Sequence, residues 1–407
     1  MKQKIRLTFF LLFLASISTA QFIGDSGRPF TRIDIPFEYI NGFIVLEVTF
    51  NYIFPLRFIL DTGAEHTILT KREYADLLGI PFEREFRIIG SDMSQDLKAY
   101  LIRNNHLQIG NLALPSQSMV VMDEDYFRFE EYTGINIHGI IGSNIFRHFV
   151  VRIDYQRKIL TLTRPIDFSP PRGFTKIPIE IFKNKAYLNA QIAFPDTNLV
   201  GLKLLVDTGA GLTLILHNGT NPEINPPEGV ISGNIGKGLG GYLEGYVGRS
   251  ESVTLGPYAL NGVVTNYQDL NPEMDTSALN NRNGIIGNLL LGRFTVIIDY
   301  FRSEMYLRPN KYFDEAFNYD RSGMGVIASG NRLGTFTVSS ILYHSPAGEA
   351  GILPGDEILF LNGLRAKYLG LSGITRKLSR KSGKTIRVTI RRKEEKMKVR
   401  FILRDLI

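Results

Sequence analysis

Several short blocks of this sequence occur twice, in the same order and at nearly constant spacing. The heptapeptide FILDTGA, which contains Asp61, returns as LLVDTGA around Asp207, so the two aspartates are 146 residues apart. Three further pairs keep almost the same offset: Ile35–Glu38 with Ile177–Glu180, His138–Gly142 with Asn283–Gly287, and Phe149–Tyr155 with Phe294–Tyr300. A period this long indicates two tandem, duplicated lobes rather than a solenoid of short repeats.

The repeated halves have the patterns of β-strands. The chain of 407 residues holds 39 Gly, 27 Phe and 18 Tyr, a composition that favours strands joined by tight turns. Helical signals are few, at Thr70–Leu78 and at Asn288–Phe294. We therefore expect a mainly β chain, with β lobes at 21–168 and 169–310 that form one bilobed unit, a connector at 311–322 and an α+β domain at 323–407.

The first twenty residues have the pattern of a secretory signal peptide. Lys2, Lys4 and Arg6 precede an apolar run that is too short to span a bilayer, and small residues end at Ala20. We expect cleavage before Gln21 and no stable membrane insertion afterwards; the alternative is that residues 1–20 remain as an anchor. The predicted location is outside the cytoplasm, in a periplasm or the extracellular space.

Composition argues against several classes of function. The chain has no cysteine and six histidines, which excludes thiolate chemistry and disfavours a multi-histidine metal centre, so we expect no metal and no cofactor. The formal charge of +7 arises locally, because residues 365–404 hold 15 of the 47 Lys and Arg residues. The rest of the mature chain is net acidic, which gives no support to a nucleic-acid partner.

The two Asp-Thr-Gly motifs carry the predicted chemistry. Each aspartate follows an apolar run, and a charged group at the end of a buried strand is costly unless its site is special. If the two loops meet, Asp61 and Asp207 lie side by side and share a proton, so that one acts as a base on water while the other donates to a carbonyl. The supporting residues are Thr62 and Thr208, whose hydroxyls can bond backbone, with Gly63 and Gly209, which permit close approach. The alternative, an ordinary turn at each motif, explains one copy better than two matched copies.

These motifs resemble those of the aspartic proteases, in particular the retroviral-like branch with Asp-Thr-Gly-Ala. The resemblance covers about residues 30–310, and it includes the Ile-Ile-Gly blocks that end at Gly142 and Gly287. It implies a retropepsin-like fold, one active site per chain, a polypeptide substrate, and Gly-rich flaps over the cleft. The flap segments would be 88–94 and 235–242, with Gly90 and Gly238 touching substrate.

The two lobes also depart from the family and from each other. Ser143 and Asn288 stand where viral members have Arg, so the ion pair that locks the viral dimer is absent. Glu65 follows the first motif, whereas Gly211 follows the second. Glu65 is therefore a candidate substrate contact on one side of the cleft, and its alternative is an exposed acid capping a turn.

The last part of the chain resembles a PDZ domain of the bacterial, protease-associated kind. The run SPAGEAGILPGDEILFLNG, residues 345–363, carries this resemblance. It implies that a loop formed by Gly323, Met324, Gly325 and Val326 offers N–H groups to the C-terminal carboxylate of a peptide, which adds as a strand. The alternative is a domain that serves packing only, with an occluded groove.

Together these features predict an exported aspartic endopeptidase with a C-terminal PDZ domain. The rival hypothesis is a catalytically silent peptide-binding or scaffold protein with a protease-like fold. Both Asp-Thr-Gly motifs are intact, which counts against the rival hypothesis.

Overall fold

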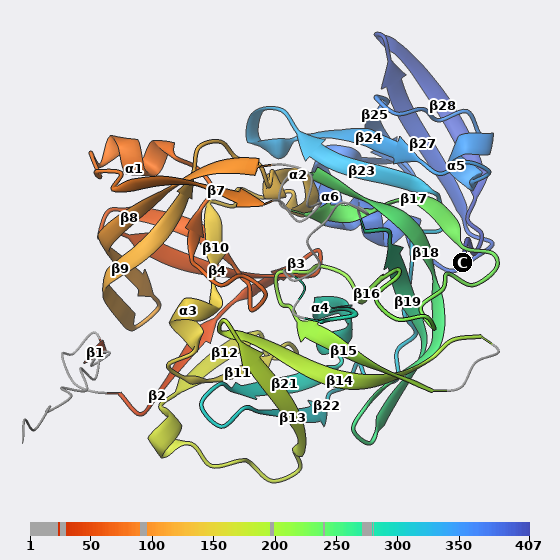
Figure 1. Ribbon diagram of the computed structural model, residues 1–407. Coiled ribbons are helices and arrows are strands. Elements are labelled where there is room, and N and C mark those ends of the chain that lie inside the picture. Colours follow the sequence, from red (N-terminus) through yellow and green to blue (C-terminus); the bar gives the residue numbers. More distant parts are fainter. Residues whose placement is uncertain are drawn as a thin grey trace, which may run out of the picture.

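The computed structural model is mainly β, and its chain runs through two β lobes into a smaller C-terminal unit (Figure 1). The structure describes residues 23–24, 30–89, 96–195, 199–238, 241–270, 279 and 281–407. Within these residues, no helix is long and apolar enough to cross a membrane. The predicted signal peptide, residues 1–20, lies outside the described residues.

The first lobe is built on one sheet with the strand order β1-β9-β6-β10-β5-β4-β8-β7, to which β3 adds beside β4. Its apolar side chains fill the interior, as in β4, where alternation gives way to a run of buried residues. The strands are β1 (Ile23–Gly24), β3 (Glu38–Ile40), β4 (Phe43–Phe50), β5 (Phe54–Leu60), β6 (Ile68–Leu69), β7 (Arg84–Ile89), β8 (Asp96–Ile109), β9 (Leu112–Met122) and β10 (Gly139–Ile141).

The second lobe belongs to a larger sheet that also takes in strands of the first half. Its order is β17-β18-β19-β16-β20-β15-β14-β13-β22-β21-β11-β12-β2. The strands are β2 (Arg32–Pro36), β11 (Val150–Asp154), β12 (Ile159–Thr163), β13 (Thr175–Phe182), β14 (Lys185–Ala193), β15 (Val200–Val206), β16 (Leu214–His217), β17 (Ile231–Gly238), β18 (Gly241–Leu255), β19 (Tyr258–Gln268), β20 (Gly284–Ile286), β21 (Phe294–Asp299) and β22 (Glu304–Pro309).

The junction of the two halves is a pairing between repeated blocks. Strands β11 and β21 come from the duplicated FVVRIDY and FTVIIDY segments, and they pair antiparallel with Arg152 opposite Ile297. Because β2, β11 and β12 lie in the same sheet as β13, β21 and β22, the halves share a base instead of standing apart. The expected boundary between 168 and 169 lies in the connection between β12 and β13, two strands of this shared sheet.

The helices of the two lobes are short. The two expected helical segments contain α1 (Glu73–Leu77) and α4 (Asn288–Leu291). The remaining helices are α2 (Phe129–Thr133), α3 (Ser143–Phe146) and the 3₁₀ turn η1 (Pro165–Asp167). Both α3 and α4 begin directly after an Ile-Ile-Gly block, so the duplication extends to this level.

The C-terminal unit has its own sheet and its own hydrophobic core. The strand order is β23-β24-β25-β27-β28, with β26 beside β25, and buried residues such as Ile374 and Leu378 of α6 cover the sheet. The elements are β23 (Met324–Ser329), η3 (Asn331–Leu333), β24 (Thr335–Ile341), α5 (Pro346–Glu349), β25 (Glu357–Leu361), β26 (Leu364–Arg365), α6 (Ala366–Leu378), β27 (Thr385–Arg392) and β28 (Glu395–Ile402).

This C-terminal unit packs against the first lobe. Helix α2 lies against both β23 and α6 (Figure 1). The Ser372 hydroxyl in α6 donates a hydrogen bond to Asn41 Oδ1 at 2.8 Å. Gly134, at φ +74°, comes so close to α6 that a Cβ there would lie 3.0 Å from Leu371 Cβ. The unit is therefore docked on the lobes rather than tethered at a distance.

Candidate active site

Two equivalent loops bring the Asp-Thr-Gly motifs to the middle of the molecule. Asp61 follows β5 directly, and Asp207 follows β15. Each of these strands pairs in parallel with an Ile-Ile-Gly strand, β5 with β10 and β15 with β20. The Asp61 N–H donates to Ile141 O and the Asp207 N–H to Ile286 O, both at 3.0 Å. The repeated blocks thus position both aspartates in the same way.

The two threonines bind the opposite loops together. The Thr62 hydroxyl donates to Val206 O at 2.7 Å and accepts the Thr208 N–H at 3.1 Å. The Thr208 hydroxyl donates to Leu60 O at 2.9 Å and accepts the Thr62 N–H at 3.0 Å. Both side chains are fully buried, so these four bonds are shielded from water. They fix the distance between the two halves at the level of the aspartates.

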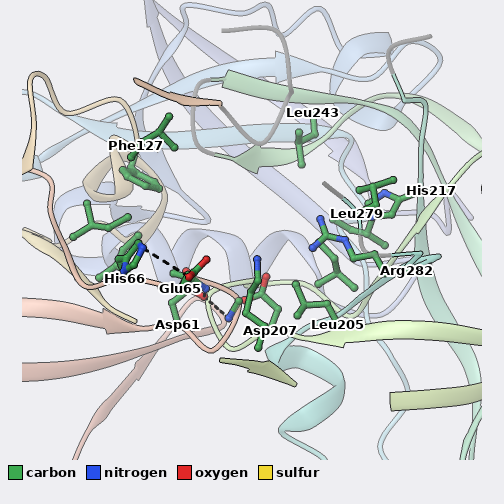
Figure 2. Close-up of a pocket in the computed structure, with 18 of the residues that line it drawn as sticks. Asp61, Glu65, His66, Phe127, Leu205, Asp207, His217, Leu243, Leu279 and Arg282 are labelled. Atoms are coloured by element: carbon green, nitrogen blue, oxygen red, sulfur yellow. Dashed lines mark hydrogen bonds and ion pairs between the residues drawn. The ribbon is translucent and has the colours of Figure 1, made fainter. Parts of the chain in front are cut away.

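The glycines of the motifs allow the aspartates to come close to the facing loop. A Cβ on Gly63 would lie 2.6 Å from Asp207 Cγ, and a Cβ on Gly209 would lie 2.2 Å from Asp61 Cγ. These separations are shorter than any side chain tolerates, so each carboxylate occupies space that only a glycine leaves free. Figure 2 shows the two aspartates next to each other at the floor of the cavity.

Backbone N–H groups hold each carboxylate in place. Asp61 Oδ1 accepts the N–H of Gly63 and that of Ala64, each at 2.8 Å, and Asp207 Oδ1 accepts the N–H of Gly209 at 2.8 Å. Burial raises the pKa of Asp61 well above its usual range, and the neighbouring Asp207 raises it further. Burial also raises the pKa of Asp207, although the Gly209 N–H and the bond with Asp61 oppose the rise. The pair therefore retains a proton to higher pH than isolated carboxyls do.

Ser143 and Asn288, the residues that replace the arginine of viral proteases, support the two loops. The Ser143 hydroxyl donates to Ala64 O at 2.8 Å. The Asn288 amide donates to Thr208 O, and its Oδ1 accepts the Tyr155 hydroxyl at 2.7 Å. Both side chains are fully buried. The sequence marked these positions only as departures from the viral pattern, and their part in holding the loops emerges from the structure.

A cavity of about 460 Å³ lies above the aspartates. Phe86 and Ile88 of β7 line it on the first-lobe side, and Leu243 of β18 lines it on the other. These residues belong to the hairpins β7–β8 and β17–β18, from which the predicted flap segments extend. Gly90 lies outside the described residues. Gly238 ends β17 opposite Gly241, so the tips of both hairpins stay predictions as substrate contacts.

Glu65 lines the same cavity, with His66 beside it. The His66 Nε2 lies 3.9 Å from Glu65 Oε1, and both side chains are partly exposed (Figure 2). The structure places Glu65 next to the dyad on the first-lobe side only, where it can reach a bound peptide. Its role as a substrate contact stays a prediction.

Two cations on the second-lobe side were not anticipated from the sequence. Lys185 and Arg282 both line the cavity, and their charges act on Asp207. Neither residue lies in one of the repeated blocks of the sequence. A comparison of the two halves at these positions, once the strand register was known, would have revealed them.

The loop from Gly323 to Val326 is positioned at the edge of the C-terminal sheet, but part of it already has a carboxylate partner. Gly323 N–H donates to Asp320 Oδ2 at 2.5 Å, and Met324 N–H donates to the same oxygen at 3.2 Å. The Ser322 hydroxyl donates to Asp320 Oδ1 at 2.7 Å. A peptide C-terminus would therefore have to displace Asp320 from these two N–H groups.

Helix α2 of the first lobe lies at the edge of β23 to which a peptide strand would add. Within the described residues, β23 pairs with β24 on one edge only, and α2 of the first lobe packs on β23 and α6. A second, smaller cavity of about 350 Å³ joins this loop to the second lobe, since Ser232 of β17 lines it together with Gly323 and Gly325. The C-terminal unit thus contacts elements from both sides of the main cleft.

The described residues contain no group of three or more His, Asp and Glu side chains arranged to hold a metal ion. The side chains of the main cavity offer two adjacent carboxyl groups with raised pKa values, a pair that can act as acid and base.

Comparison with known proteins agrees with this chemistry for part of the chain. The aspartyl protease family model matches residues 46–145, which include the first Asp-Thr-Gly motif and the first Ile-Ile-Gly block. No curated protein matches the chain. One similar solved structure is the basic 7S globulin from soybean, which is 11% identical with a TM-score of 0.44; the match covers 72% of this chain and 100% of the globulin. Another is the aspartic proteinase from Irpex lacteus, which is 14% identical with a TM-score of 0.44; that match covers 70% of this chain and 99% of the proteinase.

Proposed function

We propose that this chain is an aspartic endopeptidase in which Asp61 and Asp207 act together on one water molecule. The observation that carries the proposal is the mutual approach of the two motifs, each of which leaves room for the opposite carboxylate. The family-model match over residues 46–145 supports a protease-type function for the first half, and the duplicated second half supplies the other aspartate.

The proposed reaction uses the pair in its singly protonated form. The charged carboxylate takes a proton from water, which attacks the carbonyl carbon of the peptide bond, while the protonated carboxyl donates its proton to the carbonyl oxygen. The carboxyl that took the proton of the water then protonates the nitrogen of the tetrahedral intermediate. The other carboxylate takes a proton from a hydroxyl group of the intermediate as the C–N bond breaks, so that the pair returns to its starting form. The cavity is large enough to enclose several side chains around the scissile bond.

The raised pKa values of Asp61 and Asp207 predict the pH range of activity. The singly protonated pair exists between the two macroscopic pKa values, so the rate should follow a bell-shaped curve. In pepsin such a pair titrates in two separate steps, both in the acid range. We expect an optimum at roughly pH 4–6 here, because burial favours the neutral carboxyl.

The experiment that tests this function is a cleavage assay. The purified protein is incubated with a diverse peptide library from pH 3 to 8, with and without a hydroxyl-containing transition-state analogue, and products are read by mass spectrometry. Asp61→Asn and Asp207→Asn should each abolish cleavage with the fold retained, and the double variant should lose no more than either single one. An absence of cleavage at every pH would favour the catalytically silent scaffold.

We further propose that residues 1–20 direct export and that residues 323–407 form a PDZ-type domain. Support for export comes from the sequence pattern at Lys2–Ala20. Support for the domain comes from its separate core and from the edge strand β23, which begins at the glycine-containing loop. In this proposal the peptide groove is closed by α2 and Asp320 in the resting chain and opens only when a C-terminal peptide competes.

A further inference from the structure

Arg282 lines the main cavity on its second-lobe side and lies two residues before β20. Its neighbour Asn283 is fixed by two hydrogen bonds, from Lys203 N–H to Asn283 Oδ1 at 2.9 Å and from Asn283 Nδ2 to Thr220 O at 3.2 Å. The Arg282 N–H itself donates to Leu279 O at 3.1 Å. The backbone that carries the guanidinium is therefore held, and Figure 2 shows that group pointing into the cavity.

Among the described residues, the guanidinium of Arg282 lacks a full set of hydrogen-bond partners. Its Nε is buried and has no hydrogen-bond partner in the part of the chain that the structure describes. The groups that favour the charged form of Arg282 are Tyr187 and, at longer range, Asp207, whereas the Lys185 charge repels it. A cation removed from water without a paired anion is costly, and the cost is recovered when an anion binds.

The other cation of the cavity, Lys185, has three acids acting on it. Burial and the Arg282 charge lower the pKa of Lys185, while the charges of Glu65, Asp207 and Asp61 oppose this fall. Arg282 has none of these acids except Asp207, and that carboxylate shares its proton with Asp61. Within the described residues, Arg282 is thus the cavity cation with fewer acids acting on it.

The duplicated lobe shows that the fold does not require a cation here. Gly284 of β20 corresponds to Gly139 of β10, so Arg282 corresponds to Ile137 in the first lobe. Ile137 is almost fully buried and packs in an apolar cluster with Val45 and Ile59. An apolar residue fills this place in one half, and an arginine that reaches the cavity fills it in the other. Packing alone therefore does not account for Arg282.

We propose that Arg282 binds a carboxylate of the peptide substrate, which makes the cleft selective for acidic peptides on one side of the scissile bond. A guanidinium presents two parallel N–H donors, which match the two oxygens of a carboxylate. The carboxylate belongs to a Glu or Asp side chain or to the C-terminus of a short peptide. This inference rests on the proposed peptidase function and names its substrate class.

The test compares peptides that differ only in charge at one position. A cleaved library peptide with blocked termini is made with Glu or Gln at each position within three residues of the scissile bond, and kcat/KM is measured at about pH 6, where Glu is ionised. At one position Glu should be preferred by about 10- to 100-fold, as expected for a charge-assisted bond. A parallel pair, with a free or an amidated C-terminus within three residues of that bond, distinguishes the terminal from the side-chain carboxylate.

Variants identify the residue responsible. Arg282→Gln should bring the preferred ratio close to one, Arg282→Lys should keep part of it, and Arg282→Glu should turn it toward a Lys-containing peptide. Lys176→Gln removes an exposed second-lobe charge outside the cavity and should leave the ratio unchanged. If Arg282 acted only by shifting the pKa of the Asp61 and Asp207 pair, its replacement would change the cleavage rates of the Glu and Gln peptides by the same factor.

The outcomes separate the two proposals. Cleavage of peptides with no carboxylate preference at any position, or a preference that survives Arg282→Gln, overturns the role of Arg282 and leaves the peptidase function intact. No cleavage of any peptide by the unaltered protein overturns the peptidase function itself.

Discussion

Thr62 and Thr208 each accept the backbone N–H of the other, and each donates its hydroxyl to the strand that precedes the other's loop. This reciprocal arrangement joins residues 146 positions apart. These buried hydrogen bonds, rather than the outer walls of the cleft, therefore set the relative position of the two aspartates.

Thr62→Val and Thr208→Val should weaken both stability and cleavage. Valine has nearly the same shape but leaves a buried N–H without its acceptor, which costs about 1–3 kcal/mol of unfolding free energy. Because the bonds form one network, the double variant should lose less than the sum of the two single losses. Urea unfolding measures the free energies, and Thr62→Ser is the matched control that keeps the hydroxyl. Unchanged stability in the valine variants would contradict the role of this network.

Gly63→Ala and Gly209→Ala should abolish cleavage by pushing the carboxylates apart. The new methyl groups would lie 2.6 Å and 2.2 Å from the opposite Asp Cγ atoms, so the loops must separate. A displacement of about 1 Å at a reacting group costs roughly 100-fold in rate. Gly334→Ala is the control, because its Cβ would meet only Asn331 O at 3.8 Å. If either motif variant kept more than about a tenth of the kcat, the close approach would not matter.

Asp61→Asn should stabilise the protein at neutral pH and not at low pH. The folded pKa of Asp61 is raised by burial and by Asp207, so folding favours the protonated form. The stability that this group contributes is fully present below the unfolded pKa of about 3.9, and it is lost as the pH rises through the folded pKa. Asparagine avoids that loss. The Tm difference between variant and wild type should therefore grow from pH 4 to pH 7.

The surface carboxylate of Asp76 supplies the comparison, because Asp76→Asn removes one acid that is not part of the cleft. Its Tm difference should show no comparable growth over the same pH range. A constant Tm difference for Asp61→Asn would mean that the dyad is not forced to retain a proton.

Asp320→Ala should increase the affinity of the C-terminal unit for peptides with a free C-terminus. The change releases the N–H of Gly323 and leaves that of Met324 with only the Ser322 hydroxyl as acceptor, so both can bind an incoming carboxylate. We expect a gain of about tenfold, equal to one charge-assisted bond no longer in competition. Fluorescence anisotropy with a labelled peptide measures it, and Asp314→Ala, an exposed acid of the connector, is the control.

Lower pH should have a similar effect in the wild-type protein. Burial raises the pKa of Asp320, so it protonates at a pH where a peptide C-terminus, with a pKa of about 3.5, is still charged. Peptide affinity should rise between pH 7 and pH 5 in the wild type and stay flat in Asp320→Ala. Equal pH dependence in both proteins would show that Asp320 does not guard the loop.

The sequence by itself determined the duplication, the strand character of both halves and the residues that carry the chemistry. These are local properties: the Asp-Thr-Gly and Ile-Ile-Gly blocks recur as patterns, and apolar runs before Asp61 and Asp207 predict strands that end at a charged group. The short helices α1 and α4 were also visible, since they lie inside the segments Thr70–Leu78 and Asn288–Phe294 that have helical signals in the sequence.

Only the tertiary structure decided which edges and side chains meet. The pairing of β11 with β21 unites the halves through one sheet, and nothing in either strand alone specifies that partner. Arg282 reaches the cavity while its counterpart Ile137 is buried in an apolar cluster, and α2 lies on the edge of β23. These relationships depend on contacts between residues far apart in the chain, whereas periodicity and motif spacing report only the residues within each element.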